Sequence, residues 1–308
     1  MRKTINNKWL LIIFAALLVL VVLLFSKNDG HKERSFDKQL VTFLNDDISK
    51  IVLYPKILSG SLIEVEKTDQ GWHLKTGDKQ YRAGQNSVDG MLNSLSNLKA
   101  LNLAANSKER WETYEVSDSL ATRVQLFNNN NKKVADVYIG KFKFTQPQSM
   151  STYVRIDGKK ETYRVDGFLG SVFNQNVSDL RDKTITSDPM ANWTSLTFDY
   201  PADSSFVLIK QDNQWKIDGV LAKQDEVSRY INTVKNQNGN TIIDEPVLAG
   251  IPLYRLTIAR ENLEPIKLSV YENALGKLLA SSENEGVAFS DQSLIDRFFV
   301  PKSKFKIQ

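Results

Sequence analysis

Apolar and polar positions divide the chain into one long apolar segment near its start and a longer region of short, alternating segments. The segment from Trp9 to Phe25 contains no charged residue. Its length is close to the lower limit of about 17 residues at which a helix crosses the hydrocarbon core of a membrane. The pattern therefore predicts a transmembrane helix over residues 9–25, preceded by a cytoplasmic tail over 1–8 and followed by a charged, solvated stalk over 26–45.

A cleaved signal peptide is the alternative interpretation of the same segment. Its apolar part usually has about 7 to 15 residues and ends in small residues at a cleavage site. Here the charged stretch Ser26-Lys27-Asn28-Asp29 follows instead. We therefore favour a retained anchor.

The remaining region repeats one pattern of apolar positions. The stretch Ile51 to Pro55 is similar to the stretch Thr197 to Pro201, and a strand, polar turn and strand that include Trp72 recur around Trp215. The i, i+3, i+4, i+7 spacing of a half-buried helix joins Val88, Met91, Leu92 and Leu95 in the first copy and Val227, Tyr230, Ile231 and Val234 in the second. Each copy thus has the order β-β-α-β-β-β-β-α.

This order predicts an α+β fold in which antiparallel sheets carry helices on one face. The expected architecture is an N-terminal single transmembrane helix followed by two tandem repeated modules, residues 46–186 and 187–308, with the junction at Ser187-Asp188-Pro189. One continuous sheet shared by both copies fits the periodicity equally well.

Charge separates the flanks of the apolar segment from the rest of the chain. The whole chain has 40 basic and 36 acidic side chains and a net charge of +4. Residues 1–35 contain six of the basic and two of the acidic ones, which leaves 34 of each sign in the rest of the chain. A neutral folded region lacks the basic surface that nucleic acids require, so we expect no nucleic-acid partner.

Candidate chemistry is sparse. The chain has no cysteine and two histidines, His31 in the predicted stalk and His73 on a predicted strand. Phosphate-binding, dinucleotide-binding and serine-hydrolase glycine motifs are absent from the sequence. Carboxylates occur without a recognisable spacing at Asp118, Asp136, Asp157, Glu161, Asp166, Asp179 and Asp182. We expect no catalytic residue, no cofactor and no metal site.

Aromatic residues indicate where the chain contacts other molecules. Trp72 and Trp215 occupy the same place in the two copies, which favours a role in the core. Aromatic residues outside the repeated pattern lack that explanation and are typical of interfaces. The candidate interface residues are Trp111, Tyr114, Phe142, Phe144 and Tyr153, together with Arg181 in the charged stretch Leu180-Arg181-Asp182-Lys183. That stretch is either a docking patch or a self-paired end of the first module.

Several short motifs resemble the DUF4340 family, a family of domains of unknown function. They are the strand at Trp72, the helix with Leu92 and Leu95, Tyr114-Glu115-Val116, Val137-Tyr138-Ile139-Gly140, Tyr153-Val154-Arg155 and Leu180-Arg181-Asp182-Lys183. The resemblance is strongest from Gly71 to Lys183. The sequence departs from the family at Glu115-Val116, where members typically have a Gly-Leu pair. The resemblance implies an N-terminal anchor and an accessory role beside an ABC-type exporter similar to that implicated in gliding motility, and it brings no catalytic residues.

We therefore expect a membrane-anchored, non-enzymatic binding or scaffold protein, plausibly an accessory subunit of an ABC-type transporter complex. The flanking Lys and Arg residues do not determine the orientation of the anchor. A short tail before the anchor favours a bacterial inner-membrane location with most of the chain in the periplasm. The alternative is a periplasmic polysaccharide- or peptide-binding protein, and an enzyme is the third hypothesis.

Overall fold

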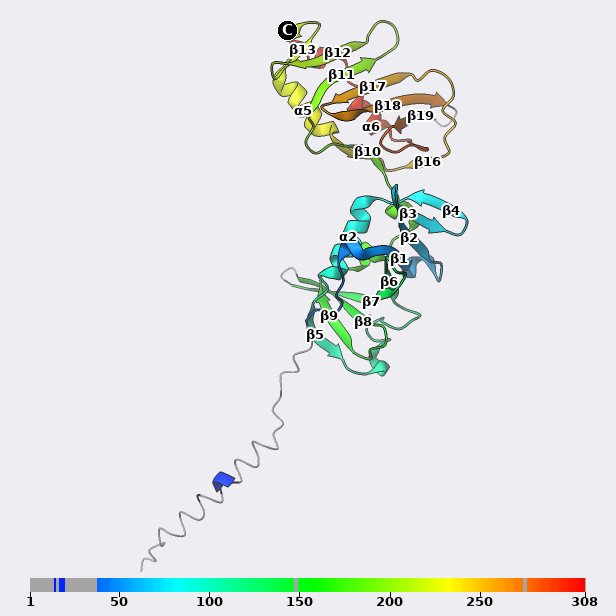
Figure 1. Cartoon of the computed structure of the whole chain (residues 1–308), viewed down its shortest axis with the longest axis vertical. Coiled ribbons are helices and arrows are strands. Elements are labelled where there is room, and N and C mark those ends of the chain that lie inside the picture. The colour runs from blue at the N-terminus through cyan, green and yellow to red at the C-terminus, as the bar shows by residue number, and fades with distance from the viewer. Residues whose placement is uncertain (1–13, 15–16, 20–37, 147–148, 274–275, 308) are drawn as a thin grey trace, which may run out of the picture. The chain divides into compact units, whose positions relative to one another are not determined.

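The computed structural model describes residues 14, 17–19, 38–146, 149–273 and 276–307. In these ranges no helix has the length and apolar character needed to cross a membrane. Most of the predicted transmembrane helix, the predicted tail and residues 26–37 of the predicted stalk lie outside the described residues. Two large, mostly antiparallel sheets with a few helices make up the rest (Figure 1).

Contacts between Cα atoms divide the chain into two compact units, residues 1–66 with 89–176 and residues 67–88 with 177–308. The division cuts through one strand and one helix of the first sheet, so the hairpin of residues 71–82 is grouped with the second unit. The division between modules at residues 186 and 187 stays a prediction.

The first sheet has the strand order β4-β3-β2-β1-β6-β7-β8-β9-β5. Its elements are β1 (Ile48–Tyr54), β2 (Ile63–Thr68), β3 (Gly71–Thr76), β4 (Lys79–Arg82), α2 (Gln85–Ser96), β5 (Ala100–Ala105), β6 (Thr122–Asn128), β7 (Lys133–Thr145), β8 (Ser149–Ile156), β9 (Thr162–Asp166), α3 (Gly170–Phe173) and α4 (Val177–Leu180), with 3-10 turns η1 (Asn45–Asp47), η2 (Lys56–Leu58) and η3 (Lys108–Arg110).

The two faces of the first sheet differ in chemistry. Leu53 lies opposite Ile63 and Val124, and Val124 lies opposite Val137. Residues opposite one another share a face of the sheet, and all four are fully buried. The neighbouring positions point to the other face, where Tyr138 lies between Arg123 and Arg155 and begins a polar cluster.

The second sheet has the order β14-β13-β12-β11-β17-β18-β19-β20-β16. Its elements are β11 (Trp193–Asp199), β12 (Phe206–Gln211), β13 (Gln214–Ile217), β14 (Val220–Leu221), α5 (Gln224–Val234), β16 (Ile242–Asp244), β17 (Tyr254–Arg260), β18 (Leu263–Asn273), β19 (Gly276–Ser281), β20 (Val287–Phe289) and α6 (Gln292–Phe298), with η4 (Lys302–Lys304) following. A separate two-stranded sheet pairs β10 (Thr184–Ser187) with β15 (Asn236–Asn238).

Both helices of the second sheet pack on one of its faces. Leu196 lies opposite Leu208 and Ile258, so the three side chains share a face. They belong to one buried cluster with Val227, Tyr230 and Val234 of α5 and Leu294, Ile295 and Phe298 of α6. The hydroxyl of Tyr230 donates to the carbonyl of Phe298 over 2.7 Å, which joins the two helices.

The two sheets have corresponding strand orders, β1 to β9 in one and β11 to β14 with β16 to β20 in the other. The predicted alignment of Ile51 with Thr197 is wrong by one residue. Ile51 lies opposite Val65 of β2, and it is Leu196 that lies opposite Leu208 of β12. A shift of one residue reverses the face of every side chain in a strand, so burial selects Leu196.

The sequence pattern missed the strands at the edges of both sheets. Each sheet has nine strands, whereas the predicted order has six. The edge strands β4, β14 and β16 have no buried residue, and the remaining edge strand, β5, has one, Ala100. Edge strands with one uncovered side need no regular apolar alternation, which is why the pattern did not predict them.

Candidate binding surfaces

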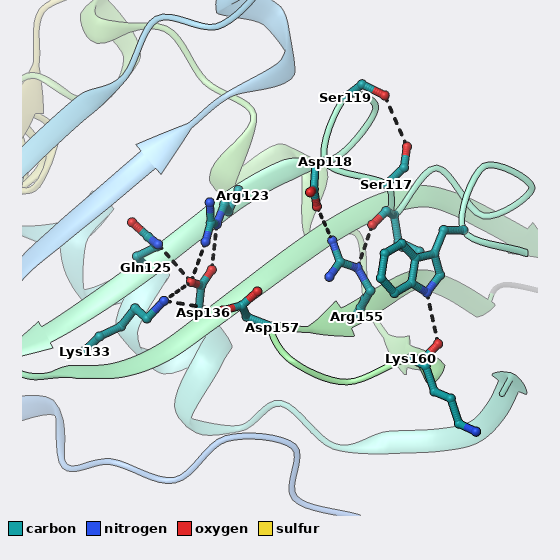
Figure 2. A network of polar contacts seen from close by, with 12 residues as sticks. Ser117, Asp118, Ser119, Arg123, Gln125, Lys133, Asp136, Arg155, Asp157 and Lys160 are labelled. Carbon is teal, nitrogen blue, oxygen red and sulfur yellow. Dashed lines mark hydrogen bonds and ion pairs between the residues drawn. The ribbon is translucent and has the colours of Figure 1, made fainter. Parts of the chain in front are cut away.

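A polar cluster lies on the outer face of the first sheet, around Asp136 of β7 (Figure 2). Arg123 donates to both oxygens of this carboxylate, from Nε over 2.8 Å and from a terminal nitrogen over 2.7 Å. Gln125 donates over 2.8 Å and the ammonium of Lys133 over 2.5 Å. The Asp136 side chain is 4% exposed, so its charge is buried and held by several donors at once.

These donors set the protonation of the cluster. Burial acts to raise the pKa of Asp136, but the hydrogen bonds from Arg123, Lys133 and Gln125 outweigh it and lower the pKa below its usual value. The bond to Asp136 in turn raises the pKa of Arg123. Asp136, Arg123 and Lys133 are therefore all ionised at neutral pH. The carboxylate is saturated with donors, which suits a structural role more than proton transfer.

Trp111, a predicted interface residue, covers the arginine next to this cluster. The guanidinium carbon of Arg155 lies 3.9 Å from the ring centroid of Trp111 and 3.6 Å from that of Tyr138. Arg155 is buried and donates to the carbonyl of Val116 over 2.9 Å and to Asp118 over 2.6 Å. The connector between β5 and β6 thus packs on the outer face through cation–π contacts.

Tyr114 and Tyr153 contact each other, with ring centroids 4.5 Å apart. The carbonyl of Tyr114 accepts a bond from the backbone nitrogen of Lys141 over 3.1 Å. Glu115, the next residue, has a left-handed φ of 57°. Glycine adopts this conformation at little cost, which gives a physical reason for the Gly-Leu pair that the resemblance leads us to expect at residues 115 and 116.

Phe142 and Phe144, two further predicted interface residues, are open to solvent. They are 48% and 55% exposed, and they lie near Met150 at 47% and Phe168 at 42%. The rings of Phe142 and Phe168 contact each other, with centroids 4.7 Å apart. We call these four residues the aromatic hairpin face, because three of them lie on the β7–β8 hairpin.

Arg181, the last predicted interface residue, has partners within its own unit. It makes a two-pronged ion pair with Asp244, and its guanidinium carbon lies 4.1 Å from the ring centroid of Tyr81. The neighbouring Asp182 forms an ion pair with Arg82, with 3.2 Å between its Oδ2 and the Arg82 Nε. Asp244 belongs to β16 of the second sheet, so Arg181 pairs outside the predicted first module, and the two interpretations of the Leu180 to Lys183 stretch stay predictions.

An aromatic cleft of about 570 Å³ opens in the second unit. The rings of Tyr200, Tyr254 and Phe299 contact one another. Their centroids are 5.5 Å apart for Tyr200 and Tyr254, 5.6 Å for Tyr254 and Phe299, and 6.3 Å for Tyr200 and Phe299. The ammonium of Lys277 lies 5.3 Å from the Tyr254 ring centroid. The hydroxyl of Tyr200 donates to the carbonyl of Val300 over 2.9 Å, and burial together with the nearby Tyr254 raises the pKa of Tyr200.

The cleft was not predicted from the sequence, although a comparison of the copies contains a signal for it. Phe198 lies opposite Leu256 as Leu53 lies opposite Val124. Two residues further along, the second copy has the aromatic pair Tyr200 and Tyr254 where the first has Pro55 and Thr122. In the first copy, the Thr122 hydroxyl instead accepts a bond from the backbone of η2 over 3.2 Å.

The remaining predictions concern histidine, tryptophan and metal sites. His73 is partly buried, and its Nδ1 lies 3.1 Å from the Thr68 hydroxyl of the same hairpin. Trp72 and Trp215 are buried, which confirms the prediction that they belong to the core. In the described part of the chain no three His, Cys, Asp or Glu side chains gather where they could hold a metal ion.

Comparison with known families identifies the chain. No curated protein and no solved structure matches it. Residues 72–250 match the family described as "Domain of unknown function (DUF4340)", and this match covers more than half of the 308 residues. The match extends beyond the stretch from Gly71 to Lys183 that carried the resemblance in the sequence. It also includes β11 to β14, α5 and β16 of the second sheet. The chain belongs to the DUF4340 family.

Proposed function

We propose that this chain is a membrane-anchored, non-enzymatic binding protein that serves as an accessory subunit of an ABC-type transporter complex. In this proposal residues 9–25 anchor it in a bacterial inner membrane, and the two units act in the periplasm. The apolar segment supports the anchor. The transporter as partner rests on the family resemblance.

The aromatic cleft carries the binding part of the proposal. Tyr200, Tyr254 and Phe299 are partly exposed and line one concave space. Ligand sites are typically concave and lined by aromatic side chains, with a few polar groups that fix orientation. Tyr200 and Tyr254 have no aromatic counterpart at the equivalent positions of the first copy. They pack against the core of the second sheet and are only partly buried, so they also line the cleft.

The polar clusters support a binding protein over an enzyme. Asp136, Arg155 and Arg181 each have donors or acceptors supplied by their own unit. Structural ion pairs of this kind perturb pKa values without catalysis. Their side chains stabilise the sheets and their connectors.

A periplasmic polysaccharide- or peptide-binding protein is the second candidate, because aromatic rings in a cleft also stack on sugars. Lys277 over the Tyr254 ring favours a protein segment. The ammonium covers one face of the ring that a sugar would use, and it offers a charge partner to a carboxylate of a bound segment.

Site-specific photocrosslinking in the native membrane tests the proposal. The full-length chain would carry benzoylphenylalanine in place of Phe299, in the cells that produce it. We expect a crosslink to a membrane-spanning or periplasmic segment of an ABC-type transporter subunit, identified by mass spectrometry. The matched control places the same group at Leu263, which is 60% exposed at the turn between β17 and β18, and should give no such product.

The other outcomes are equally informative. A chain that crosslinks to nothing at residue 299 and is recovered only as a lone monomer from solubilised membranes contradicts the accessory role. Binding of a defined glycan that is lost in Tyr254→Ala and retained in Leu263→Ala replaces it with the second candidate.

A further inference from the structure

The aromatic hairpin face extends beyond the sheet that supports it. In β7, Ile139 lies opposite Thr122, the first residue of β6. Phe142 and Phe144 come after this point and, among the residues that the structure describes, pair with β8 alone, where they lie opposite Thr152 and Met150. The hairpin therefore continues past its neighbour β6.

The exposed side chains belong to the core-facing side of the sheet. Ile139 lies opposite Val154, and both are buried. Thr152, two residues before Val154 on the same strand, shares its face and lies opposite Phe142. The hairpin thus presents the apolar face of the sheet at a place where, among the described residues, Phe168 is the ring in contact with it.

This face lies in the same row of the sheet as the start of the folded chain. Phe142 lies opposite Thr152, Thr152 opposite Val165, and Val165 opposite Ala100 of β5. The backbone nitrogen of Ala100 donates to the carbonyl of Lys38 over 2.7 Å. Three steps of about 4.8 Å between strands place Phe142 roughly 15 Å from Ala100, and so close to the residue at which the chain enters this unit.

Few residues separate that point from the predicted anchor. Residues 26–37 connect Phe25 to Lys38. Even a fully extended chain spans at most about 3.6 Å per residue, which limits the 13 steps from Phe25 to Lys38 to roughly 47 Å. An anchor in the bilayer therefore holds the first unit near the membrane surface.

We propose that the aromatic hairpin face rests on the lipid surface of the membrane that holds the anchor. This inference depends on the anchor of the proposed function and adds a second membrane contact to it. Exposed aromatic and apolar side chains bind at the boundary of headgroups and acyl chains. Lys27, Lys32 and Arg34 precede the folded region, and basic residues beside a membrane anchor favour anionic headgroups.

The absence of cysteine from the sequence permits a direct test with single labels. The full-length Phe144→Cys variant would carry an environment-sensitive fluorophore and be reconstituted into nanodiscs that contain anionic lipid. The control is Asn130→Cys, an exposed position at the β6–β7 turn, at the other end of β7. Hydrogen exchange of the β7 and β8 peptides checks that both variants fold as the parent chain does.

We expect the emission of the label at residue 144 to shift to shorter wavelength in nanodiscs. Spin-labelled lipids should quench most of this emission and leave the label at residue 130 nearly unchanged.

Three results would overturn the inference. If both labels resist quenching while the chain stays in the nanodisc, the anchor holds and the hairpin contact does not exist. A shifted but unquenched label at residue 144 means that protein, such as a second copy of this chain, covers the face. If the chain leaves the lipid altogether, residues 9–25 do not anchor it, and both the proposed anchor and this inference are wrong.

Discussion

Replacement of Asp136 by alanine removes the carboxylate at the centre of the polar cluster. Arg123 and Lys133, which are 30% and 40% exposed, then lose their main partner. Breaking a fully buried ion pair costs about 3–5 kcal/mol, whereas a solvent-exposed pair contributes at most about 1 kcal/mol. With a buried acceptor and half-exposed donors, we expect Asp136→Ala to lower the free energy of unfolding of the first unit by about 2–3 kcal/mol.

Hydrogen exchange of the full-length chain in detergent or lipid measures this loss unit by unit. Peptides from β6 and β7 report on the first sheet, and peptides from β17 and β18 should keep their protection and serve as an internal reference. The matched control is Asp166→Ala, a solvent-exposed carboxylate on β9 of the same sheet, for which we expect a change below about 0.5 kcal/mol.

The pH dependence provides a second, independent reading. The pKa of Asp136 is lowered in the folded chain, so its contribution is complete above the ordinary aspartate value of about 3.9. It is lost as the pH falls through the lower, folded value. The difference between parent and Asp136→Ala should be constant near neutral pH and shrink in acid. Equal losses for Asp136→Ala and Asp166→Ala, or a difference that grows in acid, would refute the reasoning.

Three further substitutions test the local structure. Gly140→Ala should destabilise the first unit by at least about 2 kcal/mol, because the added Cβ would lie 2.8 Å from Val116 Cγ1 and closer still to the carbonyl of Tyr114; unchanged urea unfolding would contradict this. Glu115→Gly relieves a left-handed φ, which should raise the free energy of unfolding by about 1 kcal/mol. Loss of the exposed ion pair to Lys56 reduces this gain. A clear loss of stability in thermal unfolding would contradict the prediction. Asp291→Ala removes the cap of α6 and should cost about 1 kcal/mol, seen as faster exchange in α6 with β6 unaffected.

Elements with a buried, periodic face could be predicted from the sequence. The helix that contains Met91 and Leu95 occurs as α2, and the helix that contains Val227 and Tyr230 occurs as α5. Both have apolar residues at helical spacing because one face packs on a sheet. The short outer strands carry no such signal, since their side chains need not alternate between core and water.

The candidate surfaces could be predicted only in part. Exposed aromatic residues at Phe142 and Phe144 follow from their place outside the repeated pattern. Trp111 was selected by the same argument, yet it packs on Arg155, because sequence alone does not show that a connector crosses the polar face of the sheet. The aromatic cleft depends on Tyr254 of β17, on Tyr200 just after β11 and on Phe299 just after α6. Only the folded chain brings these three residues together.

The attachment of residues 38–41 to the first sheet has a mechanical consequence. If residues 9–25 anchor the chain as proposed, a pull from the membrane would reach the described chain at Lys38. The carbonyl of Lys38 accepts a bond from Ala100 of β5, and the backbone nitrogen of Leu40 donates to the carbonyl of Leu98. Such a force would act first on these few bonds, so we expect residues 38–41 to detach before the nine-stranded sheet is loaded. With such an anchor, residues 38–41 would act as a compliant link that lengthens under tension while the sheet stays intact.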